Sequence, residues 1–333
     1  MLILSAADVR AALPMAAAIE AMKQAFAAYS SGQATVPPRI HLDIPAHRGI
    51  SLVMPAHVAT PDRESLAVKV VSLFPGNLDI GLARIQSAVL AFDPATGRPE
   101  ALLEGATLTA LRTGAASGAA TDLMAPAGAR TAAIFGAGVQ ARTQLEAVCT
   151  VRPIETAWIV SRRPESADRL IAELAGKGPI PRDLRRATSA REALRDADIV
   201  CAATAGAGGP LFDDADLKPG AHVNAVGSFQ PHVVEIPAAT VGRSWVVVDS
   251  REAALDEAGD LIQAIAAGCF QWSDVRAELG ELVTGAVPPP DRAHDGQVTT
   301  LFKSVGLAVQ DALAARSALA SARQAGLGTE VAW

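Results

Sequence analysis

The sequence lacks the cysteine patterns that build disulfide scaffolds or zinc sites. It contains three cysteines in 333 residues. These are Cys149, Cys201 and Cys269. No two of them form a CxxC pair, and none lies at the spacing from a histidine that a metal site would require. An odd number of distant thiols with apolar neighbours is typical of a reducing compartment. We therefore expect a cytoplasmic protein that has no metal site.

Clusters of basic residues and long apolar runs are also missing. The 29 Lys and Arg residues are scattered among 35 Asp and Glu residues, and the net charge of -6 disfavours a nucleic-acid partner. No apolar run reaches the roughly 18 residues that a membrane-spanning helix needs. The opening MLILSAADVRAALP has neither the basic segment nor the cleavage site of a signal peptide. We expect neither nucleic acid nor membrane as a partner.

What is present is enough apolar sequence for two domains, since half of the residues are hydrophobic. The first part shows one amphipathic helix and then several strand-like runs without helices between them. Consecutive strands of this kind predict a mainly antiparallel sheet in an α+β domain. The predicted elements are a helix over 14–30 and strands over 50–54, 66–74, 87–92 and 99–103.

The pattern changes after a predicted helix at 107–123, because strands then alternate with helices. Alternation of this kind predicts an α/β domain with a doubly wound parallel sheet. The strands are expected at 131–135, 156–160, 199–202, 222–226 and 245–248, and a last long helix is expected at 301–325. We therefore expect one domain over 1–122 plus 301–333 and a second over 123–300.

The motif AAIFGAGVQA at 132–141 matches the G-x-G-x-x-G/A fingerprint of a Rossmann dinucleotide site. Gly136 permits the tight turn, Gly138 lets the backbone approach a pyrophosphate, and Ala141 allows close packing of helix on strand. A simple packing turn is the alternative, but the strand before and the helix after the loop favour a cofactor site. The predicted cofactor-binding residues here are Gly136, Ala137, Gly138, Val139 and Gln140.

The second strand of this domain ends in Ser161, Arg162 and Arg163. An NAD site usually has a carboxylate here that binds the ribose hydroxyls, whereas two cations and a hydroxyl suit a 2′-phosphate. Two solvated arginines at a helix start would give the same pattern. The missing carboxylate favours NADP(H), with NAD(H) as the alternative.

Several separate motifs occur in the order found in one known family. They are AVKVV at 67–71, ATLTALRTGA at 106–115, the glycine loop, VVDSREA at 247–253 and TLFKSVG at 300–306. Over nearly its full length the chain thus resembles the ornithine cyclodeaminase/mu-crystallin family. The resemblance implies homodimers with a substrate and dimerisation domain, a Rossmann NADP(H)-binding domain, and a C-terminal helix that returns to the first domain.

The resemblance also implies which residues bind substrate and cofactor. Arg39, Lys69 and Arg112 would surround the substrate carboxylate, with Arg112 as a bidentate ligand and Lys69 as a charge or proton source. Taken singly, each could instead be a surface cation with a buried stem. The further cofactor-binding residues would be Thr113, Thr204, Val226, Gly227, Ser228 and Lys303, although Lys303 could serve structure alone.

One departure from the family pattern bears on the reaction. Ornithine cyclodeaminases resemble one another in an aspartate after the Val-Gly turn, and this chain has Phe229 there, in VGSFQPH at 226–232. A phenyl ring cannot accept a proton. The run is similar to members that reduce Δ1-pyrroline-2-carboxylate or Δ1-piperideine-2-carboxylate, the ketimine reductases. We therefore expect an NADPH-dependent imine reductase that forms L-proline or L-pipecolate.

Three other functions remain open. An amino-acid dehydrogenase acting on alanine or an N-alkyl amino acid would use the same carboxylate clamp and cofactor. Cyclodeamination of ornithine or lysine is a third enzymatic possibility. A non-enzymatic, crystallin-like NADPH-binding protein belongs to a different class, and cofactor binding without turnover would identify it.

Overall fold

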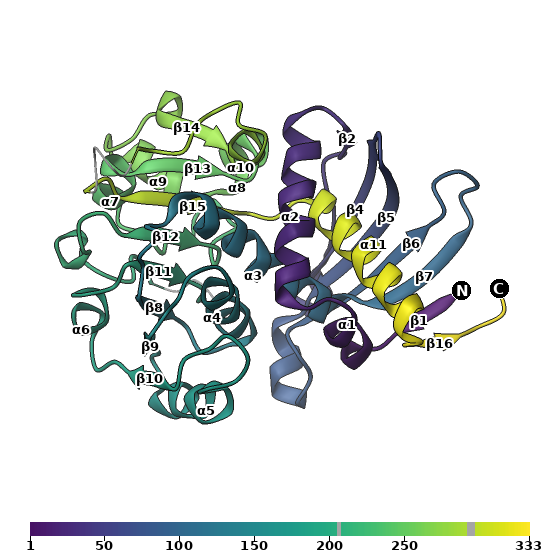
Figure 1. Ribbon diagram of the computed structural model, residues 1–333, viewed down its shortest axis with the longest axis horizontal. Coiled ribbons are helices and arrows are strands. Elements are labelled where there is room, and N and C mark those ends of the chain that lie inside the picture. The colour runs from purple at the N-terminus through teal and green to yellow at the C-terminus, as the bar shows by residue number, and fades with distance from the viewer. Residues whose placement is uncertain (205–207, 292–296) are drawn as a thin grey trace. The chain divides into compact units, whose positions relative to one another are not determined.

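The computed structural model describes residues 1–204, 208–291 and 297–333. The chain divides into two compact units, which are Met1–Arg112 with Leu307–Trp333, and Thr113–Gly306 (Figure 1). Helix α3 (Gly105–Met124) contributes residues to both. One unit has a mixed, mostly antiparallel sheet and the other a parallel sheet, so the predicted fold class is confirmed.

The sheet of the first unit has the strand order β16-β1-β7-β6-β5-β4-β2, and β3 also pairs with β4. Every pairing is antiparallel except that of β1 with β7. The strands are β1 (Leu2–Leu4), β2 (Ala34–Thr35), β3 (Ile40–Ile44), β4 (Gly49–Thr60), β5 (Arg63–Leu73), β6 (Ile85–Phe92), β7 (Pro99–Glu104) and β16 (Thr329–Glu330).

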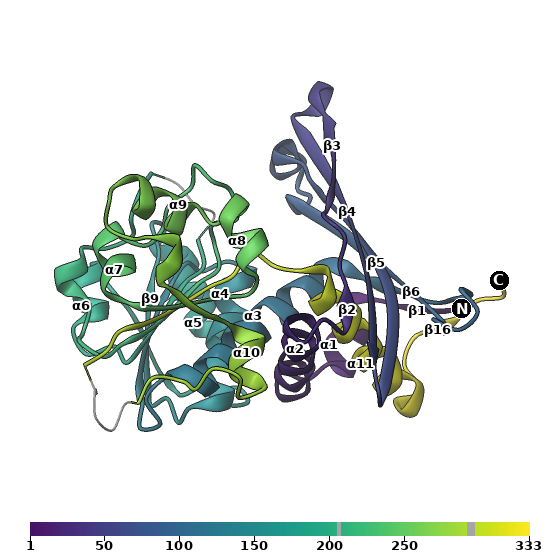
Figure 2. The same ribbon diagram turned by 90° about the horizontal axis from the view of Figure 1, so that it is seen from above.

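Three helices, α1 (Ala6–Ala12), α2 (Met15–Ser30) and α11 (Ala308–Ala325), cover one face of this sheet (Figure 2). Helix α11 packs on α2 and on strands β4 to β6. Strand residues that point toward the helices are buried, including Lys69, whereas Val70, which points the other way, is 40% exposed. The period-2 alternation of the strands therefore separates a covered face from an open one.

The sheet of the second unit is parallel throughout, with the order β10-β9-β8-β11-β12-β15-β13-β14. Its strands are β8 (Thr131–Phe135), β9 (Thr156–Val160), β10 (Asp183–Arg186), β11 (Ile199–Ala202), β12 (His222–Ala225), β13 (Trp245–Val248), β14 (Val275–Glu278) and β15 (Thr300–Lys303). The helices are α4 (Val139–Val151), α5 (Pro164–Leu174), α6 (Ala190–Leu194), α7 (Ala238–Arg243), α8 (Arg251–Glu257), α9 (Gly259–Ala266) and α10 (Leu279–Val283), with part of α3.

Two separate cores lie on the two faces of the parallel sheet. Along β8, Ala132 and Ile134 belong to the core under α4 and α5, whereas Ala133 and Phe135 belong to the opposite core. Residues of one strand thus alternate between two buried faces, which explains why the strands read as continuous apolar runs. The doubly wound arrangement predicted from the sequence is confirmed.

The predicted start of the last helix is wrong. Thr300–Lys303 form strand β15 between β12 and β13, and the helix begins at Ala308. The turn between them is held by Asp249, whose Oδ2 accepts hydrogen bonds from the Ser304 hydroxyl and from the backbone N–H groups of residues 305 and 306, at 2.7–2.8 Å. Gly306 completes this turn with a φ of 86°. In the part of the chain that the structure describes, no helix is long and apolar enough to span a membrane.

Candidate active site

The glycine loop follows β8, which lies between β9 and β11 in the parallel sheet. Gly136 has a φ of 116°, and a Cβ on it would lie 2.5 Å from the carbonyl oxygen of Ala203, so only glycine fits. Gly138 is the N-cap of α4, and its missing Cβ faces open space. The backbone N–H groups at the start of α4 are thus accessible to a pyrophosphate. The predicted loop residues 136–140 all lie at this helix start.

Helix α3 reaches the same region through close contact with α4. Gln144 Nε2 donates a hydrogen bond to the carbonyl oxygen of Thr113 at 3.3 Å, and Thr113 is buried. A Cβ on Gly114 would lie 2.6 Å from the carbonyl oxygen of Thr143. This close approach of the two helix backbones brings Thr113 against the helix that begins at the glycine loop.

The residues predicted to bind a 2′-phosphate follow the end of β9, the strand next to β8. The Ser161 hydroxyl accepts a hydrogen bond from the backbone N–H of Arg163 at 3.3 Å. Arg162 and Arg163 are exposed, and neither is ion-paired within the described part of the chain. Two exposed cations with spare donors suit a phosphate that adds two negative charges.

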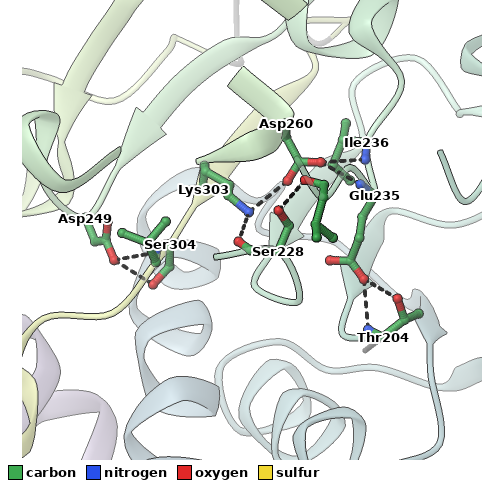
Figure 3. A network of polar contacts seen from close by, with 10 residues as sticks. Thr204, Ser228, Glu235, Ile236, Asp249, Asp260, Lys303 and Ser304 are labelled. Atoms are coloured by element: carbon green, nitrogen blue, oxygen red, sulfur yellow. Dashed lines mark hydrogen bonds and ion pairs between the residues drawn. The ribbon is translucent and has the colours of Figure 1, made fainter. Parts of the chain in front are cut away.

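A buried ion pair joins Lys303, the last residue of β15, to Asp260 in the first turn of α9 (Figure 3). Lys303 Nζ donates to the carbonyl oxygen of Ser228 at 2.5 Å and lies 2.8 Å from Asp260 Oδ2. The other carboxylate oxygen of Asp260 accepts the backbone N–H groups of residues 235 and 236, at 2.6 and 2.9 Å. Both charged side chains are fully buried. Lys303 therefore fixes the chain at Ser228 from inside the unit, and its predicted contact with cofactor stays a prediction.

A second buried carboxyl group, that of Glu235, lies beside the predicted cofactor residue Thr204 (Figure 3) and against Gly227. Glu235 Oε1 accepts the backbone N–H of Thr204 at 2.9 Å and also its hydroxyl. A Cβ on Gly227 would lie 2.3 Å from Glu235 Oε2, so the carboxyl group packs directly against this glycine. Burial raises the pKa of Glu235, against the opposing effects of the Thr204 hydrogen bonds and the charge of Lys303.

In the first unit, two of the three predicted substrate cations share one carboxylate. Lys69 on β5 lies with its Nζ 2.6 Å from Asp311 Oδ2, and Arg112 Nε donates to Asp311 Oδ1 at 3.1 Å. Arg112 Nη1 donates to Gln310 Oε1 at 3.2 Å. The side chains of Lys69, Arg112 and Asp311 are each 8% exposed or less. The third cation, Arg39, precedes β3 and is half-buried.

Burial, together with the neighbouring guanidinium groups, lowers the basicity of Lys69. Burial lowers the pKa of Lys69 to about 8, and Arg112 and Arg39 act in the same direction. The negative charge of Asp311 and its hydrogen bond oppose this shift. An ammonium group with such a pKa can lose or regain a proton near neutral pH, as acid–base catalysis requires.

Hydrogen-bond donors remain available in the cluster. Lysine has three donors and arginine five, yet within the described residues Arg112 Nη2 has no acceptor and the only polar partner of Lys69 Nζ is Asp311. Two buried cations that share one carboxylate are also costly without another anion. The arrangement therefore suits the binding of a small carboxylate.

Sequence reasoning missed the carboxylates Asp260, Glu235 and Asp311. Asp311 had a detectable signal, because it occupies the buried face of α11 among alanines and Leu319. A charged residue on an apolar helix face usually has a buried partner.

The chain matches the sequence profile of the ornithine cyclodeaminase/mu-crystallin family over residues 1–325. It is 39% identical to a Delta(1)-pyrroline-2-carboxylate reductase of Bacillus thuringiensis subsp. konkukian, with 99% of each chain covered.

Two solved structures share the whole fold. The Delta(1)-pyrroline-2-carboxylate reductase of Thermococcus litoralis, in complex with NADH and L-proline, superposes with a TM-score of 0.92 at 41% identity, covering 99% of this chain and 100% of the other. An archaeal alanine dehydrogenase dimer with bound NAD superposes with a TM-score of 0.90 at 29% identity, covering 100% and 99%.

Proposed function

The chain belongs to the ornithine cyclodeaminase/mu-crystallin family, and from that premise we propose that it reduces Δ1-pyrroline-2-carboxylate and Δ1-piperideine-2-carboxylate with NADPH. The products are L-proline and L-pipecolate. The coarser statement, that the protein is an imine-reducing oxidoreductase with a nicotinamide cofactor, rests on the reductases that it resembles. The observation that supports the finer proposal is the buried cluster of Lys69, Arg112 and Asp311.

In this proposal Arg112, Lys69 and Arg39 bind the substrate carboxylate. Arg112 Nη2 and the remaining hydrogens of Lys69 Nζ supply the donors, and the low dielectric around them strengthens each bond. Fixing the carboxylate fixes C2, the ring carbon next to it, because the two are covalently joined. Such positioning is a major source of rate enhancement.

The reduction also needs a proton. When bound, the reduced nicotinamide supplies a hydride for C2. The C=N π electrons then become the lone pair of the ring nitrogen, so one proton must be delivered to that nitrogen. Lys69 is the proposed donor, because its pKa of about 8 leaves it mostly protonated at neutral pH and still weakly acidic.

The preference for NADPH is proposed from Ser161, Arg162 and Arg163. The relative from T. litoralis was solved with NADH, so the comparison supports a nicotinamide cofactor without distinguishing the two. The two exposed arginines and the absence of a carboxylate among residues 161–163 favour the 2′-phosphate.

We also propose that the protein is a homodimer joined through the open face of the first unit's sheet. Ile40, Val53, Val70 and Ala88 form one row across four strands on this face. Ile40 is 61% exposed and Val70 is 40% exposed, and an exposed apolar row of this kind usually marks an interface. Analytical ultracentrifugation tests this proposal. A dimeric wild type and a monomeric Val70→Lys variant would support it, and a monomeric wild type would reject it.

The deciding experiment measures oxidation of NADPH and NADH with each of the two cyclic imino acids. Fast turnover that prefers NADPH is expected, and Arg112→Ala should lower kcat/KM by about a hundredfold or more. Turnover of pyruvate with ammonia or an alkylamine would favour an amino-acid dehydrogenase. Release of ammonia from ornithine or lysine would favour a cyclodeaminase, and cofactor binding without any turnover would favour the crystallin-like alternative.

A further inference from the structure

We propose that Asp311 is a positioning residue for this reaction, which holds Lys69 and Arg112 in place from opposite oxygens of one carboxylate and keeps Lys69 in its charged form. The inference rests on the proposed function for its catalytic consequence. Its geometric basis is independent of that function, because every contact lies within the first unit.

Asp311 joins three elements that are far apart in sequence. Its Oδ2 lies 2.6 Å from Lys69 Nζ of β5, and its Oδ1 accepts from Arg112 Nε of α3 at 3.1 Å. The residue itself is on α11, and each of the two cations contacts a different oxygen. The carboxylate thereby sets the distance between the two cations, which is the distance that a substrate carboxylate must match.

The start of α11 is built to hold Asp311 in this position. Gln310, next to it, accepts the backbone N–H of Leu307 at 2.7 Å and also binds Arg112 Nη1. Asp311 lies in the first turn of an 18-residue helix, where the helix dipole favours a negative charge. Asp311 is 1% exposed, so water does not weaken its attraction for the cations.

Asp311 is also the group that opposes the loss of the Lys69 proton. Burial, Arg112 and Arg39 all lower the pKa of Lys69, and Asp311 raises it. Without this carboxylate, a buried amine would face two guanidinium groups, and the neutral form would dominate at neutral pH. A residue that served only packing would not change the protonation of Lys69.

The chain offers a direct measurement, because it contains only five lysines. The full-length protein is labelled with carbon-13 at the lysine Cε, and the Lys69 signal is assigned by its loss in Lys69→Arg. In Asp311→Asn, the titration midpoint of Lys69 should fall by at least about one pH unit. Asp311→Glu, which retains the charge, should restore most of it, and Asp214→Asn, which removes a carboxylate paired with Arg243 in the other unit, should leave it unchanged.

Activity then separates the two proposals. In Asp311→Asn, kcat for Δ1-pyrroline-2-carboxylate should fall about tenfold or more, and the alkaline limb of the pH profile should move to lower pH. An unchanged Lys69 midpoint would overturn the role of Asp311, whatever the activity. A shifted midpoint in a protein whose wild type reduces no imino acid would retain the control of Lys69 by Asp311 and reject the proposed function. If Asp311→Asn fails to fold, Asp311→Ser decides, because it also removes the charge; a Lys69 midpoint that stays at the wild-type value in this variant would overturn the role of Asp311.

Discussion

The pair of Lys303 and Asp260 allows a quantitative prediction, because both side chains are fully buried. Asp260→Asn leaves the Lys303 ammonium group with one hydrogen-bond partner among the described residues, the carbonyl oxygen of Ser228. Removing one partner of a buried pair costs about 3–5 kcal/mol. Lys303→Met should cost less, since Asp260 keeps two backbone N–H donors at 2.6 and 2.9 Å. The double variant should cost less than the sum of the two single changes.

A matched control exists in the same unit. Asp198 has the same kind of partners, with Lys218 on one oxygen and the backbone N–H groups of residues 130 and 131 on the other, but Lys218 is 40% exposed. Water solvates that ammonium when its partner is neutralised, so Asp198→Asn should cost about 1 kcal/mol from the lost ion pair.

Thermal unfolding of Asp260→Asn, Lys303→Met, the double variant and Asp198→Asn measures these differences in stability. Three of the four tryptophans, at positions 158, 245 and 272, lie in the second unit, so their fluorescence follows its unfolding. A cost of this size corresponds to a Tm lower by roughly 10 °C for Asp260→Asn, against a few degrees for Asp198→Asn. Equal losses for the two aspartate variants would refute the assignment of a desolvated ion pair to Lys303 and Asp260.

Three further predictions concern the proposed reaction. Lys69 donates in its protonated form, so kcat/KM should be level below about pH 8 and fall above it; a profile that rises there would exclude the donor role. Arg162→Ser with Arg163→Ser should raise KM for NADPH about tenfold or more and leave KM for NADH nearly unchanged, whereas parallel changes would point to a structural role. Gly136→Ala should abolish cofactor binding, measured by NADPH fluorescence, because its Cβ would lie 2.5 Å from a backbone oxygen; unchanged affinity would contradict the loop geometry.

Much of the fold follows from local patterns in the sequence. Strands β8 and β9 coincide with the predicted segments because each is a short apolar run between turn residues. The glycine loop could be located because its backbone conformation admits few residues. These features depend on neighbours in sequence, which a reader of one sequence can assess.

Features that depend on distant partners could not be predicted in this way. The segment Thr300–Lys303 forms a strand because its backbone pairs with β12 on one side and with β13 on the other. Its four residues are too few to show a strand pattern of their own. The positions of Lys69 and Arg112 were suggested by family motifs, but their shared carboxylate lies about two hundred residues away from Arg112. Contacts across that separation have no local signal.

The place of β15 in the parallel sheet has a consequence for synthesis of the chain. This strand lies between β12 and β13, so the sheet of the second unit has an internal gap until residue 303 leaves the ribosome. The first unit is completed later still, because α11, which covers its sheet, and β16, which forms one edge of it, are synthesised after β15. Both units therefore stay incomplete, with apolar strand surface exposed, until these late segments have been synthesised, and during that interval the nascent chain needs protection from aggregation.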